Sequence, residues 1–159
     1  MLKLLVFAAC ERLIIGQDNA SSLIALLENI NVEVERDMPL EAAIPIKWNI
    51  VTLWRRAGQV EQETVYEQRV DIVRKDGEVI GGGTNVFTVS NNHLNYRNQV
   101  DMFGMPIGLE GDVTLRLRLK EQEQGDDGWK EWGEYPILIT YKVKEGDGEE
   151  PTAEATEVG

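Results

Sequence analysis

Nucleophilic catalysis needs a Ser or Cys nucleophile, a His base beside it and a third group that orients the base. The chain has one His, His93, and one Cys, Cys10. His93 follows Asn91-Asn92 in a polar, turn-like stretch, which favours an exposed loop residue. Cys10 lies in an apolar run rather than in the electropositive setting that yields a thiolate, and no Gly-x-Ser-x-Gly is present. The sequence therefore predicts no nucleophilic catalytic set.

Paired carboxylates could support glycoside or other hydrolysis if one of them lay in an apolar pocket that raises its pKa. Glu67 and Asp71 share one face of an expected strand, but Arg69 lies between them. Glu33 and Glu35 have the same alternating spacing. Successive residues on one strand face are roughly 7 Å apart, so these charges are typical of a solvated, mutually screened surface.

A calcium site would need six or more oxygen ligands converging from loops. Asp126-Asp127 and Glu110 with Asp112 could lie at one end of a sandwich, near Asp18 or Asp76. No Asp-x-Asp-x-Asp-Gly loop is present. Acidic residues are also what ordinary turns contain, so the sequence leaves the calcium site open and names no metal ligands and no cofactor.

The four Trp residues could form a platform for sugar rings if several were exposed and coplanar. Trp48 and Trp54 share one strand parity, and Trp129 and Trp132 flank the start of the last expected strand. Because a Trp buries a large area, the simpler interpretation is that Trp48 and Trp54 anchor the core and Trp129 covers a loop.

The elements that would position these residues are strands, because apolar residues alternate with a period of two. Residues 113–120 alternate without a break, with Val113, Leu115, Leu117 and Leu119 on the apolar face. The same pattern recurs at Ile46, Trp48, Ile50 and Trp54, at Tyr66, Val70 and Ile72, and at Tyr135, Ile137, Ile139, Tyr141 and Val143.

Turn residues separate these runs. Asp76-Gly77 is a strong hairpin signal because a type I′ turn needs positive φ, and Gln17-Asp18-Asn19-Ala20 predicts a second hairpin. Gly81-Gly82-Gly83 falls inside a strand-like stretch and indicates a bulge or an edge break. This glycine run lacks the spacing and the following Lys of a phosphate-binding loop.

Residues 21–30 are ambiguous, since Leu23, Leu26, Leu27 and Ile30 also have helical spacing. They follow a turn and continue into an alternating stretch, which favours a strand. We therefore predict an all-β domain at residues 1–144. It is an antiparallel β-sandwich of about eight strands, immunoglobulin-like in size. Residues 145–159 predict a disordered acidic tail, because they carry six acids and no bases.

The first ten residues have some features of a bacterial lipoprotein signal that ends at Cys10. The apolar stretch from Leu4 to Ala9 is six residues long, short of the roughly 7–15 that such a signal requires. Apolar residues also resume at Leu13. We therefore expect a buried strand from Lys3 to Ile15, with Cys10 as a small core residue. An unpaired Cys and no export signal predict a cytoplasmic protein.

The formal net charge of the chain is -12. Residues 145–159 hold six of the 28 acids and none of the 16 bases, so residues 1–144 carry 22 acids against 16 bases, a net of -6. This balance argues against binding nucleic acid or anionic membranes, both of which select for basic surfaces. Arg55-Arg56 and Arg116 with Arg118 could still form a local positive patch.

Three stretches follow one another along the chain: residues 7–15 followed by 22–30, then Pro106-Ile107-Gly108 with residues 111–117, then Glu134-Tyr135-Pro136-Ile137. Together they resemble a bacterial family classed only as a domain of unknown function. The order and spacing of these pieces, rather than any single motif, carry the resemblance over residues 1 to about 143. The resemblance implies a compact β-sandwich with an early hairpin at residues 12–27, and it implies no activity or catalytic residues.

The leading functional hypothesis is a non-enzymatic cytosolic module that binds an unidentified protein partner, by way of an exposed sheet edge. The second is a ligand-binding module for sugar or calcium, and the third is a carboxylate-based hydrolase. The sequence favours a protein without enzymatic activity but does not decide the matter, and it leaves the oligomeric state open.

Overall fold

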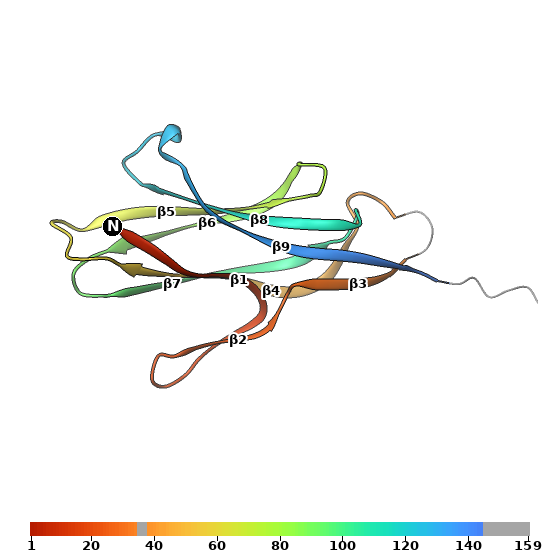
Figure 1. Cartoon of the computed structure of the whole chain (residues 1–159), viewed down its shortest axis with the longest axis horizontal. Helices are drawn as coiled ribbons and strands as arrows, with labels where there is room; N and C mark the ends of the chain where they lie inside the picture. Colours follow the sequence, from red (N-terminus) through yellow and green to blue (C-terminus); the bar gives the residue numbers. More distant parts are fainter. Residues whose placement is uncertain (35–37, 145–159) are drawn as a thin grey trace, which may run out of the picture.

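The computed structural model describes residues 1–34 and 38–144 and shows two β-sheets packed face to face (Figure 1). One sheet has four strands in the order β2-β1-β4-β7, and the other has five in the order β3-β9-β8-β5-β6. The strands are β1 (Leu2–Ile15), β2 (Ser21–Leu26), β3 (Asn29–Val34), β4 (Ala43–Arg56), β5 (Thr64–Val73), β6 (Val79–Val89), β7 (Asn95–Pro106), β8 (Gly111–Glu121) and β9 (Lys130–Val143). The predicted all-β sandwich is confirmed.

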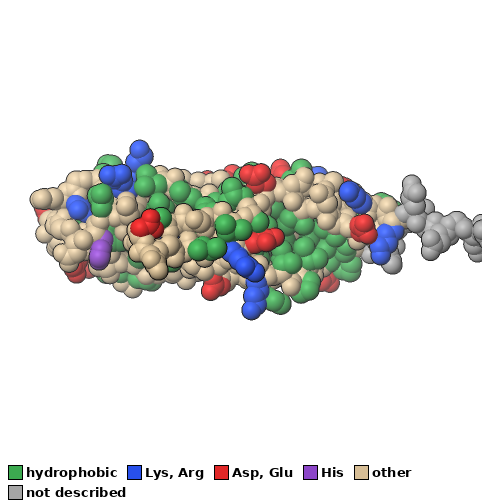
Figure 2. Space-filling model, turned by 90° about the horizontal axis from the view of Figure 1, so that it is seen from below, with side chains coloured by type: hydrophobic (Ala, Val, Ile, Leu, Met, Phe, Trp, Pro, Cys, Tyr) green, Lys and Arg blue, Asp and Glu red, His purple; other side chains and the backbone are tan. Residues whose placement is uncertain are grey.

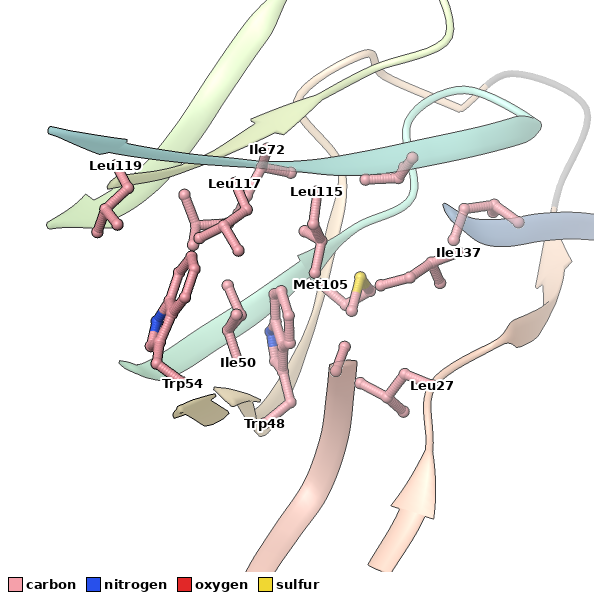
Figure 3. Packing of buried hydrophobic residues seen from close by; sticks show 14 of the residues in the cluster. Leu27, Trp48, Ile50, Trp54, Ile72, Met105, Leu115, Leu117, Leu119 and Ile137 are labelled. Carbon is pink, nitrogen blue, oxygen red and sulfur yellow. The ribbon is translucent and has the colours of Figure 1, made fainter. Parts of the chain in front are cut away.

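The core lies between the two sheets and follows the predicted alternation. Trp48, Ile50 and Trp54 of β4 point toward Leu115 and Leu117 of β8 (Figure 3), and all five are at most 1% exposed. Burying each such side chain stabilises the fold by about 1.5–3 kcal/mol relative to leaving it in water.

The ambiguous segment at residues 21–30 forms two strands in different sheets. β2 pairs antiparallel with β1, whereas β3 pairs parallel with β9, from Asn29 opposite Leu138 to Val34 opposite Val143. Two backbone hydrogen bonds secure the crossing between the sheets. The Leu27 N–H donates to the Ala9 carbonyl (3.0 Å), and the Leu138 N–H donates to the Glu28 carbonyl (2.9 Å). The strand prediction is confirmed, and the parallel pairing is a feature that the sequence did not predict.

The prediction of a buried strand from Lys3 to Ile15 is wrong for its last residues. Pairing of β1 with β4 ends at Cys10, and pairing with β2 takes over from there. Beyond Cys10 the two strands form a hairpin that projects below the sandwich (Figure 1), so Ile14 and Ile15 are each 51% exposed. Cys10 itself is fully buried, as predicted.

A buried polar network joins the sheets beneath β6. The side-chain oxygen of Gln68 accepts hydrogen bonds from Thr52 Oγ1 (2.7 Å) and Trp54 Nε1 (2.8 Å), and a longer one from Asn98 Nδ2 (3.3 Å). The Gln68 amide then donates to Asn85 Oδ1 of β6 (3.0 Å). Because buried polar groups without partners are costly, this network fixes the position of β6 against the opposite sheet.

The two predicted hairpins are present. Gly77 has φ +87° in the turn between β5 and β6, and Asn19 has φ +63° in the turn between β1 and β2. The predicted disordered tail at residues 145–159 and Glu35 lie outside the described residues. In the part of the chain that the structure describes, no helix is long and apolar enough to cross a membrane.

Candidate functional site

The acidic residues proposed for calcium do not meet at one end of the sandwich. Glu110 and Asp112 flank the start of β8, whereas Asp126 and Asp127 follow its end. An eleven-residue strand separates the two groups, which corresponds to about 35 Å. Within residues 1–34 and 38–144, no group of three or more His, Cys, Asp or Glu side chains could hold a metal ion. The expectation of a shared end is wrong because it ignored the length of the strand between the loops.

The paired carboxylates on β5 are neutralised by bases. Asp71, whose side chain is 3% exposed, contacts Arg69 (2.7 Å) and also pairs with Arg118 of β8. Glu67 pairs with Lys120 (3.4 Å). The predicted mutual screening is confirmed, but the prediction of a solvated face is wrong at Asp71, whose side chain is buried against Arg69 and Arg118. Because Arg118 and the neighbouring Arg116 are both in ion pairs, they do not form a free positive patch.

The Trp residues follow the simpler of the two interpretations. Trp48 is 1% exposed and Trp54 is fully buried, so neither can serve in a surface platform. Trp129 lies against Lys120, with Nζ 4.9 Å from the ring centroid. Trp132 packs edge-on against Trp54, with ring centroids 5.0 Å apart.

The two residues considered for nucleophilic chemistry differ in burial: His93 is exposed and Cys10 is buried. His93 is exposed, as predicted for a loop residue. Burial raises the pKa of the Cys10 thiol, which disfavours the thiolate form that a nucleophile requires.

The outer edge of β6 is the feature that the structure singles out. β6 is the last strand of the five-stranded sheet, and its eleven residues, VIGGGTNVFTV, include no charged residue and no Pro. Natural edge strands are usually protected by charges, Pro or short length. β7, the edge strand of the other sheet on the same side, carries Arg97, Asp101 and Pro106. β6 therefore offers a long row of backbone groups that neither a charge nor a Pro protects, with one register shift near its start.

A cleft opens between β6 and β7 on the inner side of this edge. It has a volume of about 860 Å³ and is bordered by apolar side chains that include Leu40, Ile80, Met102 and Phe103. Phe103 is 70% exposed, the highest value of any large apolar residue of the described chain after Met1. The cleft is suited to apolar side chains.

A second hollow, of about 450 Å³, lies on the outer face of the sheet over the glycines of β6. Its lining includes Gly82, Thr84 and the ion pair of Arg69 with Asp71. Gly82 faces Asp71 and Thr84 faces Arg69 in the strand register, so all four residues belong to the same outward face. The three glycines of β6 place no side chain over this part of the sheet.

Arg74 closes one end of the cleft but does not make it an anion site. Its guanidinium donates to the Leu40 carbonyl (3.2 Å) and pairs with Asp76 (3.2 Å) and Glu78. The pKa of the Asp76 carboxyl is lowered, first by the hydrogen bond from the Glu78 N–H and then by Arg74. Two carboxylates already neutralise this cation, so the cleft does not select a negatively charged ligand.

Specific contacts hold β6 in place as an edge. Gly82 has φ +156°, and a Cβ there would lie 2.2 Å from the Val70 carbonyl oxygen, so the backbone conformation at this position requires glycine. A Cβ at Gly83 would lie 2.7 Å from Val100 of β7. The glycines therefore allow β6 to pack closely against both β5 and β7.

The glycine run at residues 81–83 partly predicted the edge strand β6. The glycine run was expected to mark a bulge or an edge break, and β6 is indeed an edge strand with a register shift near its start. The two hollows were not predicted, because each is formed with residues of another strand or loop: Arg69 and Asp71 for one, and Leu40, Met102 and Phe103 for the other.

Neither the family models nor the curated proteins compared with the chain match it. Among solved structures, the N-terminal domain of PorA is similar, with a TM-score of 0.29 and 10% sequence identity over 86% of this chain and 98% of that chain. At that TM-score the similarity carries no argument. The family resemblance noted from the sequence stays a prediction.

Proposed function

We propose that this protein is a non-enzymatic interaction module that binds a protein partner by adding a strand to the edge of β6. The observation that carries the proposal is an eleven-residue edge strand without charges, bordered by a hollow on each side of the sheet. In strand addition, backbone hydrogen bonds supply affinity, and pockets for alternate side chains supply specificity.

The two hollows match the geometry of an added strand. Successive side chains of a strand point to opposite faces of its sheet. A strand paired with residues 80–84 would direct one set of side chains toward the apolar cleft near Ile80 and Met102, and the other toward the hollow over the glycines of β6. The preferred partner segment is therefore extended, with apolar residues at the alternate positions that face the cleft.

The test is affinity capture from the native cell with three forms of the full chain. Wild type is compared with Val86→Lys, which puts a charge on the exposed edge, since Val86 is 54% exposed. Leu138→Lys is the matched control. Leu138 is 42% exposed but lies on β9, which is paired on both sides by β3 and β8.

We expect a partner that is enriched by wild type and Leu138→Lys and lost with Val86→Lys. Hydrogen exchange of the purified complex should then show slower exchange of the amides of residues 79–89. Partners that all three forms capture equally, or a complex without protection in β6, would overturn the proposal.

A further inference from the structure

This inference rests on the proposed function, in which a strand is added to the edge of β6. The shape of β6 indicates which strand that is. We propose that β6 pairs antiparallel with β6 of a second copy of this chain, about a two-fold axis at Thr84. Val86 of each copy then enters the hollow over Gly82 of the other.

The register follows from the strand itself. Thr84 is the middle residue of β6, so a pairing centred there makes Val79–Val89 of the two copies overlap, with regular pairing over residues 81–87, between the register shifts at Ile80 of the two copies. In that register Gly82 faces Val86 of the second copy, and the symmetry repeats the contact in reverse. Residues directly opposite each other in an antiparallel pair place their side chains on the same face.

The contact places an exposed apolar side chain, Val86, opposite the hollow over Gly82. Val86 shares the outward face with Thr84 and Gly82, because their partners on β5 are Glu67, Arg69 and Asp71. Val86 is a large apolar side chain left 54% exposed, and the hollow over Gly82 lies two positions beyond the axis on that face. Self-pairing would remove the exposed Val86 side chain from water and occupy part of the hollow over Gly82.

Charge permits this pairing. β6 brings no ionised side chain to the axis. The nearest bases on the outward face are the Arg69 residues, each opposite Thr84 and bonded to its own Asp71. Three strand spacings separate Arg69 of one copy from Arg69 of the other, about 14 Å. This separation exceeds the Debye length of about 8 Å at physiological salt. The overall negative charge of the protein opposes association, so the dimer should strengthen with added salt.

The first test is the oligomeric state of the full chain by sedimentation velocity over a concentration series. Wild type and Leu138→Lys should dimerise with similar dissociation constants, and Val86→Lys should raise the constant at least about tenfold. Circular dichroism on each variant confirms that it is folded. A wild type that stays monomeric throughout the series overturns the self-pairing, as does a dimer that Val86→Lys leaves intact.

The second test fixes the register with a disulfide. Opposed Cα atoms in an antiparallel pair are about 4.5–5.5 Å apart, within the range that a disulfide spans. Thr84→Cys should therefore form a crosslinked dimer under mild oxidation. Thr88→Cys, also exposed and on the same face, should not, because its two copies lie about 27 Å apart in this register. Wild type reports any crosslinking through Cys10.

The outcomes separate this inference from the proposed function. A monomer whose β6 is still required to capture another protein retains the function and overturns the self-pairing. Equal crosslinking of Thr84→Cys and Thr88→Cys overturns the register and with it the proposed contact of Val86 with the hollow over Gly82.

Discussion

Two tyrosine hydroxyl groups show how differently one polar atom can affect this sandwich. The Tyr96 hydroxyl accepts a hydrogen bond from the Ser90 N–H (2.9 Å) and donates to the Ser90 carbonyl (2.7 Å). The Tyr135 hydroxyl is buried and finds no hydrogen-bond partner among the described residues. The first closes the loop that follows β6, whereas the second is a polar atom that the fold tolerates at a cost.

Replacing each tyrosine with Phe should therefore shift stability in opposite directions. Tyr135→Phe removes a buried, unpaired hydroxyl and should raise the free energy of unfolding by up to about 1 kcal/mol. Tyr96→Phe leaves the buried Ser90 N–H unpaired and should lower it by about 1–3 kcal/mol. Urea unfolding of both variants against wild type measures the two effects. A Tyr135→Phe protein that is as destabilised as Tyr96→Phe would show that the Tyr135 hydroxyl has a partner.

At the scale of elements, one arginine contacts the turn of the hairpin formed by β1 and β2. Arg97 of β7 donates to Ser21 Oγ (2.6 Å) and to Asn19 Oδ1 (3.1 Å) at the hairpin turn. Because β2 and β7 are opposite edges of the same sheet, this contact places the turn over the outer face of that sheet. Figure 2 views the molecule from this side and shows hydrophobic side chains among scattered charges.

Arg97→Ala should loosen the hairpin without unfolding the sandwich. Loss of these hydrogen bonds should speed amide hydrogen exchange in residues 21–26 about tenfold, while exchange in β8 stays unchanged. Arg55→Ala is the control, since Arg55 is an exposed arginine on β4 of the same sheet. Unchanged exchange in Arg97→Ala would show that packing, rather than this contact, holds the hairpin.

Prediction from the sequence succeeded where local pattern decides the structure and failed where distant segments meet. The alternation at Val113–Leu119 and the Asp76-Gly77 turn both appear as predicted. The β3–β9 pairing joins segments about a hundred positions apart, for which no local pattern exists. The inward position of Gln68 could have been predicted, since it is a polar residue that alternates with Tyr66 and Val70. Its hydrogen-bond partners on β4, β6 and β7 could not, because they depend on how the sheets stack.

At the scale of the whole molecule, several titrating groups make the folded state more stable at neutral pH than at alkaline pH. Burial, followed by nearby carboxylates, raises the pKa of Tyr66 and Tyr141, and burial raises that of Tyr135. Burial also raises the pKa of Cys10. A group whose pKa is higher in the folded state contributes its stability below its unfolded pKa and loses it as the pH rises. The net charge of -12 acts in the same direction, since further ionisation increases repulsion.

Thermal stability should therefore decline on the alkaline side. The pKa values of Cys and Tyr in an unfolded chain are about 8.5 and about 10. The melting midpoint should therefore begin to fall at about pH 9. Differential scanning calorimetry from pH 7 to 11 in low and high salt measures the effect. High salt should reduce the part caused by net charge and leave the part caused by burial. A midpoint that is constant to pH 11 would contradict the assignment.

The parallel pairing of β3 with β9 also constrains how the chain folds during synthesis. β3 is made early, but the strand that it pairs with is the last of the described chain, so its hydrogen bonds must wait until residues 130–143 are available. Such long-range contacts slow folding and expose unpaired strands meanwhile. While the ribosome completes the chain, β3 and the uncharged β6 are both open to neighbouring nascent chains. The order in which the strands emerge therefore decides which unpaired strands are exposed during synthesis.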